Sequence, residues 1–529
     1  MSPTGYDSDP GSVTAPKRSI GAAIAAAPSG GTVVLRGGTY HESVTIPSGK
    51  AVTVQSYPGE VVWMDGTRGV SGFVQGSVGW AAPWNVRLDS SPTFTWGAPD
   101  STTQYWQFVN PSYPMAAHPD MVWLGGVQQR QVGSLSQLVP GTFYVDQGSA
   151  LLYLGSDPSG QDVRSSDLPR AFNIAAADVT IRGIGVRRFA SSVPHQGVIT
   201  ARGASFRLEN VVVDDSATGA VGVFGVNSVL DHVSIARSGQ LGVQGHQVDN
   251  LRILSSSITE SNNQSFNQMP AAGGIKLTSS RYFELRNSVV SGGTGNGVWM
   301  DMSCYDMTLV NNRVSDNSGR GIFLEVSSVA TVAGNLLTNN NDEGFVARGT
   351  DRVKLWNNTI IGTTKAIDFS KDSRNQSNSA SCRDTRRPFP DPEMPWTIGN
   401  SSVGDNVIQS GKAFLSVEDW THVLDASSAG FQIDGNLYSA PVAPSPWWMI
   451  VWARAGTDPA VYDSPATFTT QRGQDANSRL IRGASAVGSS FSLTPTASSM
   501  ESSVAQPLPA DVAAKLGREP GSRHLGYWP

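Results

Sequence analysis

The stretch GNGVWMDMSCYDMTLVNNRVSDNSGRGIFLEVSS, residues 295–328, contains one phrase twice, first as GVWMDMS and then as GIFLEVS. Each copy places an aromatic residue and then a carboxylate at alternate positions, Trp299 with Asp301 and Phe323 with Glu325. Alternation with a period of two is typical of a half-buried β-strand. The two copies therefore predict two equivalent strands, and their acids are expected at the same position of each strand.

The same pattern continues on both sides of this stretch. From Ser205 the chain divides into lines that nearly superimpose, such as NSVLDHVSIARSGQLGVQGHQV and VATVAGNLLTNNNDEGFVARGT, with a period of 22 to 24 residues. Each line holds an alternating strand, a Gly/Asn/Ser turn and a second short strand. Leucine-rich repeats would need a regular leucine frame, and propeller blades would need about twice this period. The repeat predicts an all-β fold, a right-handed parallel β-helix.

The repeat also divides the chain into four parts. The segment RSIGAAIAAAP predicts a short helix that caps the first coils, and PLPADVAAKLG predicts another short helix near the end. Between them the repeat is lost once, where Gly and Pro turns predict antiparallel strands. We expect the cap and first coils in 1–75, an inserted antiparallel β subdomain in 76–170, regular coils in 171–374, and irregular late coils and loops in 375–529.

Asn312, Asn335 and Asn358 share one position at the end of the first strand of successive lines. Stacked amides in a solenoid satisfy one another and the backbone groups of the turn. We therefore expect an inward asparagine ladder with no catalytic role.

Composition restricts the possible partners. The 529 residues include 56 Gly and carry a formal net charge of −5, and no long Lys/Arg run could neutralise a row of phosphates, so no nucleic-acid partner is expected. No apolar run reaches the length of a membrane span. The opening MSPTGYDSDPGS has no leader, and we expect a secreted protein whose signal peptide has been removed, with a cytosolic start as the alternative. Cys304 and Cys382 are too few for a zinc site, and they either form one disulfide or remain free.

Asp301 and Glu325 are 24 residues apart, which is one full coil. Residues on neighbouring rungs of a sheet lie about 4.8 Å apart in the backbone. Retaining glycosidases hold a nucleophile and an acid/base about 5 to 5.5 Å apart, so this spacing suits retaining glycoside hydrolysis. Two like charges at this separation also favour keeping one proton on the pair. The alternatives are two solvated surface acids, or a pair that holds a cation.

Other side chains share the columns of these acids. His246, Thr278 and Arg348 align with the acids themselves. Exposed aromatic side chains beside carboxylates suit a sugar ring, whose apolar face stacks on aromatic rings. We expect catalysis by Asp301 and Glu325 without a metal or cofactor, and substrate binding by Trp299, Phe323, Lys276, His246, Arg348 and Asp368. The charged run from DFSKDSRNQS to CRDTRRP either walls this site or is a solvated loop.

GVWMDMS, followed one coil later by GIFLEVS and preceded by AGGIKLT, resembles the active-site face of parallel β-helix glycosidases in the pectate-lyase-like superfamily. The resemblance is to the retaining β-xylosidases, and it covers roughly Gly273 to Ser328. It implies a carbohydrate substrate, Asp301 as the nucleophile and Glu325 as the acid/base. Two other functions stay open: a polysaccharide lyase or epimerase, and a carbohydrate-binding solenoid without catalysis. The sequence does not indicate the oligomeric state.

Overall fold

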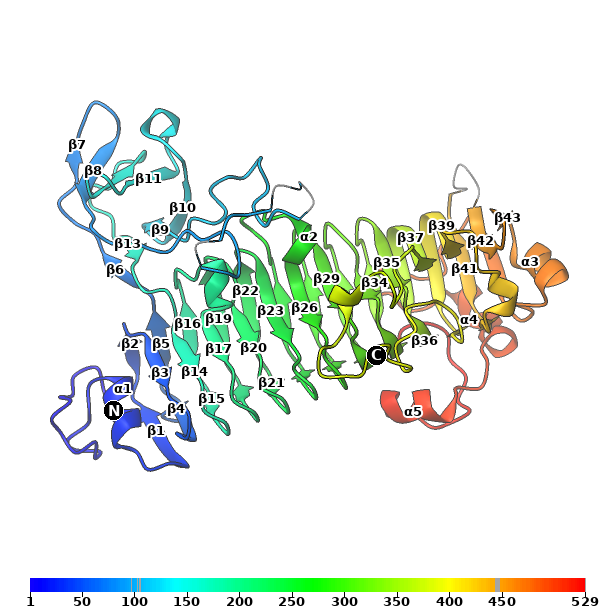
Figure 1. The fold of residues 1–529 in the computed structure, drawn as a ribbon, viewed down its shortest axis with the longest axis horizontal. Coiled ribbons are helices and arrows are strands. Elements are labelled where there is room, and N and C mark those ends of the chain that lie inside the picture. The colour runs from blue at the N-terminus through cyan, green and yellow to red at the C-terminus, as the bar shows by residue number, and fades with distance from the viewer. Residues whose placement is uncertain (97, 102, 104–105, 443–447, 529) are drawn as a thin grey trace. The chain divides into compact units, whose positions relative to one another are not determined.

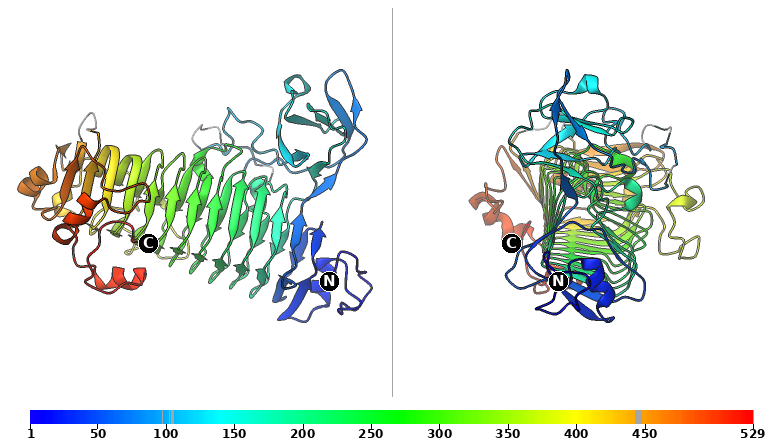
Figure 2. Two further views of the ribbon diagram at one scale, coloured as in Figure 1. Left: turned by 180° about the vertical axis from the view of Figure 1, so that it is seen from behind. Right: turned by 90° about the vertical axis from the view of Figure 1, so that its left-hand side faces the viewer.

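The computed structural model describes residues 1–96, 98–101, 103, 106–442 and 448–528. It divides into two compact units, the first of Met1–Gln244 with Ser257–Gly273 and the second of Gly245–Ser256 with Gly274–Pro529. In each unit, short strands pair in parallel with the equivalent strands of the next coil (Figures 1 and 2). Parallel crossovers of this kind are right-handed. The predicted right-handed parallel β-helix is confirmed.

The first unit begins with the predicted capping helix, α1 (Ile20–Ala26), whose Ile20 and Ile24 are buried. One sheet of its coils contains β1 (Gly31–Leu35), β4 (Val52–Ser56), β15 (Thr180–Arg182), β18 (Arg207–Glu209) and β21 (Val229–Asp231). The other coil strands are β2 (Gly38–Tyr40), β3 (Val44–Ile46), β5 (Val62–Asp65), β14 (Phe172–Ile174), β16 (Gly185–Arg187), β17 (Ile199–Ala201), β19 (Val212–Ser216), β20 (Val221–Val223), β22 (Ser234–Ser238) and β25 (Ser257–Thr259). The unit also holds the short helices η2 (Val193–His195) and α2 (Gln268–Ala271).

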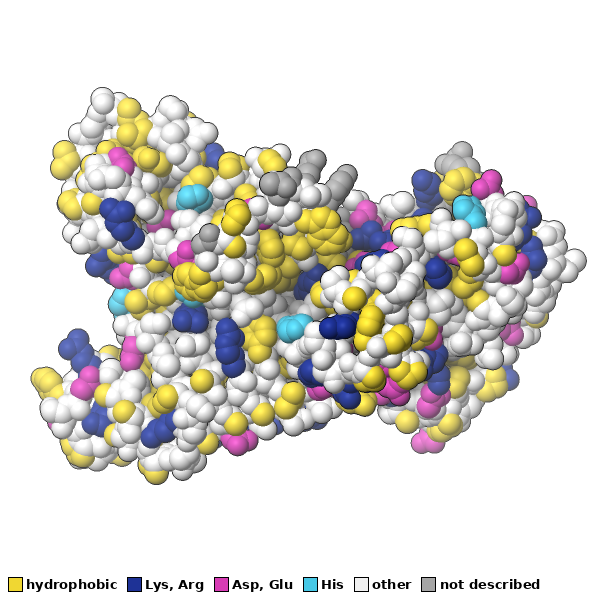
Figure 3. Space-filling model, viewed as in Figure 1, with side chains coloured by type: hydrophobic (Ala, Val, Ile, Leu, Met, Phe, Trp, Pro, Cys, Tyr) yellow, Lys and Arg dark blue, Asp and Glu magenta, His cyan; other side chains and the backbone are white. Residues whose placement is uncertain are grey.

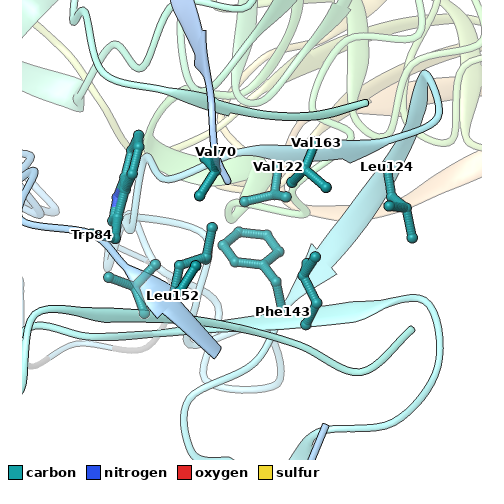
Figure 4. Close-up of a cluster of buried hydrophobic side chains, with 10 residues drawn as sticks. Val70, Trp84, Val122, Leu124, Phe143, Leu152 and Val163 are labelled. Carbon is teal, nitrogen blue, oxygen red and sulfur yellow. The ribbon is translucent and has the colours of Figure 1, made fainter. Parts of the chain in front are cut away.

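The predicted inserted subdomain lies in the first unit and has its own core. Its strands are β6 (Thr67–Gly69), β7 (Val74–Gln75), β8 (Trp80–Pro83), β9 (Val122–Leu124), β10 (Val127–Gln131), β11 (Thr142–Asp146), β12 (Leu151–Leu154) and β13 (Val163–Ser166), with the short helix η1 (Leu135–Gln137). The pairs are antiparallel except β10 with β11. Figure 4 shows Phe143 and Leu152 facing Val122 and Val70 from opposite sides of this core, with Trp84 at one end.

The second unit has the same coil construction. One of its sheets holds β24 (Arg252–Leu254), β27 (Glu284–Arg286), β30 (Tyr305–Val310), β33 (Ser328–Ala333), β36 (Asp351–Trp356), β38 (Ser402–Gly404) and β40 (Gln432–Asp434). Further strands are β26 (Gly273–Thr278), β28 (Val289–Ser291), β29 (Asn296–Asp301), β31 (Arg313–Ser315), β32 (Ile322–Glu325), β34 (Leu336–Thr338), β35 (Glu343–Arg348), β37 (Thr359–Lys371), β39 (Val407–Asp419), β41 (Leu437–Ala440), β42 (Trp448–Arg454), β43 (Thr457–Tyr462) and β44 (Arg479–Arg482). Strand β23 (Leu241–His246) contains the boundary between the units.

Apolar side chains stack from coil to coil inside the second unit. Leu285 pairs in register with Leu309, Leu309 with Val332, and Val332 with Leu355, and all four are fully buried. This is what the alternating pattern predicts, because every second side chain of a strand points to the same face. The inward column fixes the register, and the register in turn fixes which outward side chains become neighbours.

The predicted asparagine ladder is present. Asn312 Nδ2 donates to Asn335 Oδ1 at 3.0 Å, and Asn335 Nδ2 donates to Asn358 Oδ1 at 3.0 Å. The ladder also continues through Asn406 to Asn436, which the sequence analysis did not include. All five asparagines are fully buried, so the amides are structural.

The second unit also contains three α-helices near its C-terminal end in sequence. They are α3 (Pro465–Arg472), α4 (Pro495–Val504) and α5 (Ala510–Leu516), with the short turns η3 (Ala380–Cys382) and η4 (Ala426–Ser428). The helix predicted from PLPADVAAKLG is α5, and its Val512 and Leu516 pack against Val310, Ala333 and Trp356. Within the part of the chain that the structure describes, none of the helices has the length and apolar composition needed to cross a membrane.

On the face that Figure 3 draws, Lys and Arg side chains form small separate groups, with Asp and Glu side chains beside several of them. A continuous basic band is the usual footprint of a protein that binds a phosphate backbone. This face has no such band.

Candidate active site

The two predicted acids lie on adjacent strands of the second unit. β29 and β32 pair in parallel, with Trp299 opposite Phe323 and Met300 opposite Leu324. Asp301 and Glu325 are the next residues of the two strands, so they occupy equivalent positions on neighbouring rungs. The repeated phrase thus puts two carboxylates side by side.

Asp301 is held by a cation and by its own backbone. Its Oδ2 lies 3.2 Å from Lys276 Nζ, and its Oδ1 accepts a hydrogen bond from the Met302 amide at 2.7 Å. The Lys276 ammonium also lies 3.2 Å from the centroid of the Trp299 ring. Only 8 % of Asp301 is exposed. Lys276 therefore stabilises negative charge on a carboxylate that has lost most of its water.

Glu325 is more deeply buried, and both of its oxygens have protein partners. Arg374 Nη2 donates to Oε1 at 2.5 Å, and Trp299 Nε1 donates to Oε2 at 3.0 Å. Burial raises the pKa of Glu325, and the neighbouring Asp301 charge raises it further, whereas Arg374 and Lys276 oppose the shift. The net direction is upward, which favours a protonated Glu325.

Arg374 belongs to the charged run after β37, so that run walls the site. Asp372 Oδ2 accepts a hydrogen bond from Arg374 Nε at 2.9 Å and fixes the guanidinium against Glu325. Sequence reasoning named this run but did not assign Arg374 to Glu325, because the loop breaks the repeat that defines the columns. Instead it aligned Arg348 with Glu325. The two are opposite in register, but Arg348 Nε bonds Ser370 Oγ at 3.3 Å rather than the acid.

The prediction that Trp299 and Phe323 are exposed is wrong. Their exposed fractions are 1 % and 0 %, and the two rings stack at 5.5 Å with an interplanar angle of 17°. Side chains one rung apart in a column cover each other. Lys276 then covers the free side of Trp299, and Arg348 and Arg320 cover Phe323. The stacked rings contact Glu325 and Lys276 and position them, and neither ring has an open face on which a sugar could stack.

Trp420 is an exposed aromatic residue near the site that the sequence analysis did not identify. It is 51 % exposed, and the Arg348 guanidinium lies 4.7 Å from its ring and 5.3 Å from that of Phe323. Its amide donates to Lys371 O at 2.9 Å, immediately beyond the strand pair β37 and β39. In the sequence, Trp420 can be recognised only as a tryptophan that follows the acidic end of a strand, because its coil is longer than the repeat.

The last two predicted residues lie farther along the columns. His246 is exposed, and its Nδ1 lies 2.8 Å from Thr278 Oγ1, as expected for the acid column. Asp368 is 2 % exposed and lies two coils beyond Phe323, with Lys365 Nζ 3.6 Å from its Oδ1. The structure brings Lys276, Trp299, Asp301, Phe323, Glu325 and Arg348 together, and it places His246 and Asp368 at the two ends of this group.

Of the two alternatives that the sequence left for the cysteines, the structure has the second, since Cys304 and Cys382 are both free thiols. Cys304 is fully buried, its Sγ bonds Asp301 O at 3.2 Å, and burial raises its pKa to about 12. The loop that carries Cys382 lies against the coil of Asp301, because Ser303 Oγ donates to Cys382 O at 2.8 Å. The thiol of Cys304 is thus enclosed within the coil while Cys382 lies on the covering loop.

Among the residues described by the structure, no group of three or more His, Cys, Asp or Glu side chains is arranged to hold a metal ion.

Comparisons with known proteins agree with the fold. The family model for right handed beta helix regions matches residues 196–360. A search of curated proteins finds no match. Among solved structures, the chain is similar to XylC in complex with xylose, with 14% identity, a TM-score of 0.62 and 83% of each chain covered. It also matches pectate lyase Pel9A with 12% identity, a TM-score of 0.38 and coverage of 82% of this chain and 77% of that one. The periplasmic alginate epimerase AlgG matches with 9% identity, a TM-score of 0.36 and 76% of each chain covered. At 14% identity the likeness to XylC is one of fold, and together with the family model it agrees with a right-handed parallel β-helix.

Proposed function

We propose that this chain is a retaining glycoside hydrolase, with Asp301 as the nucleophile and Glu325 as the acid/base. The observation that carries the proposal is the pair of carboxylates on adjacent rungs, one bound by Lys276 and the other raised in pKa. Retaining hydrolysis needs one ionised and one protonated carboxyl group close together. The surroundings of Asp301 and Glu325 differ in the direction that this division of roles requires.

In the first step, an Asp301 carboxylate oxygen bonds to the anomeric carbon while the bond from that carbon to the leaving oxygen breaks. Glu325 gives its proton to the leaving oxygen. The products are a glycosyl ester of Asp301, a free alcohol and an ionised Glu325. Trp299 and Arg374 each donate a hydrogen bond to Glu325, and they are already in place to stabilise this anion.

The second step uses the changed charge of the site. Once Asp301 is an ester it is neutral, so its contribution to the raised pKa of Glu325 disappears. Glu325 then accepts a proton from the water that attacks the anomeric carbon, and the sugar leaves with its configuration retained. Asp301 is released as a carboxylate beside Lys276, which restores the starting charges.

We propose a β-xyloside as the first substrate to test, because the sequence resembles retaining β-xylosidases and the similar structure of XylC holds xylose. Trp420 is the exposed aromatic surface on which the sugar would stack, since it lies against Arg348 at the end of the acid column. We further propose that the protein acts outside the cell.

A panel of 4-nitrophenyl glycosides tests the proposal. We expect release of nitrophenol from a β-glycoside, the β-xyloside first, and a product that carries the β configuration when its NMR spectrum is recorded before mutarotation. An α product would contradict the retaining assignment, and turnover that survives Asp301→Asn would contradict the site.

A polysaccharide lyase or epimerase is the second candidate. The observation in its favour is the pair of cations on the acids, Lys276 on Asp301 and Arg374 on Glu325, since such enzymes need a base beside a group that neutralises a uronate carboxylate. An unsaturated product that absorbs ultraviolet light, formed from a uronic-acid polymer, would support it. Sugar binding without turnover of any substrate would instead support a carbohydrate-binding solenoid.

A further inference from the structure

Two arginines of the first unit converge over one pair of strands. Residues of β14 and β17 pair in parallel, with Asn173 opposite Thr200. Arg170 precedes β14 and reaches forward, so that its Nη1 lies 3.4 Å from Asn173 Oδ1. Arg202 follows β17 and reaches back, and its Nη2 donates to Gln196 Oε1 at 3.0 Å. Arg170 thus lies along β14 and Arg202 along the neighbouring β17, and the two strands pair side by side.

These two cations have no acidic partner among the residues that the structure describes. Other arginines of the same coils do have one, such as Arg187 with Asp65 at 2.8 Å and Arg237 with Asp215 at 2.7 Å. Burial lowers the pKa of Arg170 and of Arg202, and the charge of Arg202 lowers that of Arg170 further. Arg170 is half-buried and Arg202 is exposed, and two cations on neighbouring strands repel each other, a cost in free energy that a bound anion would offset.

An exposed aromatic ring lies beside this pair. His195 is 7 % exposed, and the Arg170 charge contributes to lowering its pKa to about 4, after the larger effect of burial. The Trp96 ring packs against the His195 ring at 5.1 Å and 78°, and 60 % of Trp96 is exposed. Arg202 also lies over the Phe224 ring at 5.0 Å. Gln196, which Arg202 bonds, directly follows His195, so the exposed Trp96 ring packs on the same short segment that Arg202 contacts.

We propose that Arg170 and Arg202 bind the carboxylate of an acidic sugar, with Trp96 stacked on the sugar ring. The planar guanidinium fork matches a carboxylate in two parallel hydrogen bonds. Aromatic rings suit the apolar face of a sugar, and the amides of Asn173 and Gln196 supply hydrogen-bonding groups for hydroxyls. The ligand class is therefore a uronic acid or its glycoside. This site does not rest on the proposed hydrolase, because none of its residues takes part in that chemistry.

Titration calorimetry of the full chain with methyl β-D-glucuronide tests this proposal. We expect binding of the glucuronide and no measurable binding of methyl β-D-glucoside, which has the same ring without the carboxylate. Arg170→Gln and Arg202→Gln should each weaken binding by at least about tenfold, the loss expected for a charge-assisted hydrogen bond. Arg182→Gln is the matched control, because Arg182 is exposed and bonds the Gln55 amide just as Arg202 bonds Gln196.

Two further measurements separate the possible explanations. Trp96→Ala should weaken the glucuronide several-fold but leave the weaker binding of acetate unchanged. Asp301→Asn should keep glucuronide affinity whatever it does to hydrolysis, so failure of this proposal and failure of the hydrolase assignment are distinguishable. Equal affinity for the glucoside, displacement by sulfate at the same concentration as the glucuronide, or full binding by both arginine variants would overturn the proposal. Unchanged near-ultraviolet circular dichroism of each variant establishes that it is folded.

Discussion

The asparagine ladder and the acid pair are two polar columns of the second unit, and they behave in opposite ways. Asn335 accepts from Asn312 and donates to Asn358, so each amide satisfies the next. Asp301 and Glu325 follow the same one-coil repeat, yet they recruit Lys276, Arg374 and Trp299 from outside the column.

The difference lies in hydrogen-bonding capacity rather than in position. An amide has both a donor and an acceptor, so a stack of amides is complementary to itself. A carboxylate only accepts, so two stacked carboxylates repel unless a cation or a proton lies between them. A repeated polar residue therefore shows only that the position recurs in each coil. Its side-chain chemistry decides whether the stacked residues hydrogen-bond one another, as the amides do, or hold a proton that can be transferred, as the carboxyl groups do.

Replacing the nucleophile should have the largest effect. Asp301→Asn keeps the shape of the side chain but removes its nucleophilic charge, and we expect kcat to fall by on the order of 10⁴ or more. Initial rates with an aryl glycoside measure this loss. Asp316→Asn is the control, since Asp316 is an exposed acid of the same unit, and its rate should stay within about twofold of the parent rate. Equal losses in both variants would mean that the acid pair has no special role.

Replacing the acid/base residue should lower the rate less than replacing the nucleophile, and the loss should depend on the leaving group. Glu325→Ala removes the proton donor, so we expect a loss of about 10² to 10⁴ with poor leaving groups and a much smaller loss with activated ones. Azide needs no general base and should restore part of the rate, with a β-glycosyl azide as product. Mass spectrometry detects that adduct. Equal losses on both substrate types, without an azide product, would refute the assignment of Glu325.

A substitution in the asparagine ladder should lower stability and leave activity unchanged. Asn335→Ala strands the buried Leu309 carbonyl and the Asn312 amide, both of which now bond Asn335. Unpaired buried groups of this kind cost about 1 to 3 kcal/mol each, so we expect a loss of roughly 3 kcal/mol in unfolding free energy. Urea unfolding followed by circular dichroism measures it. The exposed Asn341→Ala should change little, and a matching loss there would show that the ladder is not specially sensitive.

The regular coils were the part of the molecule most open to prediction from sequence. The period of 22 to 24 residues specified the fold, the asparagine ladder and the adjacency of Asp301 and Glu325, because a solenoid turns sequence spacing directly into rung spacing. The exposure of Trp299 and Phe323 was not predictable in this way. Both rings are buried because cations from neighbouring coils cover them, and the alternating pattern of a strand does not show where those side chains point.

The irregular segments hid the remaining site residues. Arg374 reaches Glu325 from a loop after β37, and Trp420 follows a strand of a longer late coil. Neither position belongs to the 22 to 24 residue frame, so no column could be drawn through it. The same frame correctly aligned Arg348 with Glu325, but register gives backbone neighbours and does not give side-chain direction, and Arg348 bonds Ser370 instead.

An exposed aromatic residue should matter for substrate binding, in contrast to the buried pair beneath it. Trp420→Ala removes the proposed stacking surface, and we expect KM to rise about tenfold with little change in kcat. Trp448→Ala is the control, because Trp448 is exposed on a later strand of the same unit. Steady-state kinetics with the aryl xyloside separate KM from kcat. A loss confined to kcat would place Trp420 in the chemical step and contradict a stacking role.

The smallest expected effect is on the pH dependence of stability, which should differ between the acid pair and the asparagine ladder. Glu325 has a pKa above its ordinary value of about 4.5, so between that value and the raised one the folded chain keeps a proton that the unfolded chain loses. Its contribution to stability is therefore complete below about pH 4.5 and declines as pH rises through this window, by at most about 1.4 kcal/mol per pH unit.

Glu325→Gln cannot titrate, so the unfolding free energy of the parent should fall relative to this variant as pH rises. Asp301→Asn removes only the repulsive part of the shift and should show an intermediate slope, because burial remains. Asn335→Ala changes no titrating group, so its loss of stability should be the same at every pH. Parallel pH profiles for the parent and Glu325→Gln would show that the proton is not held by this acid, and the contrast between the columns would then not lie in their protonation.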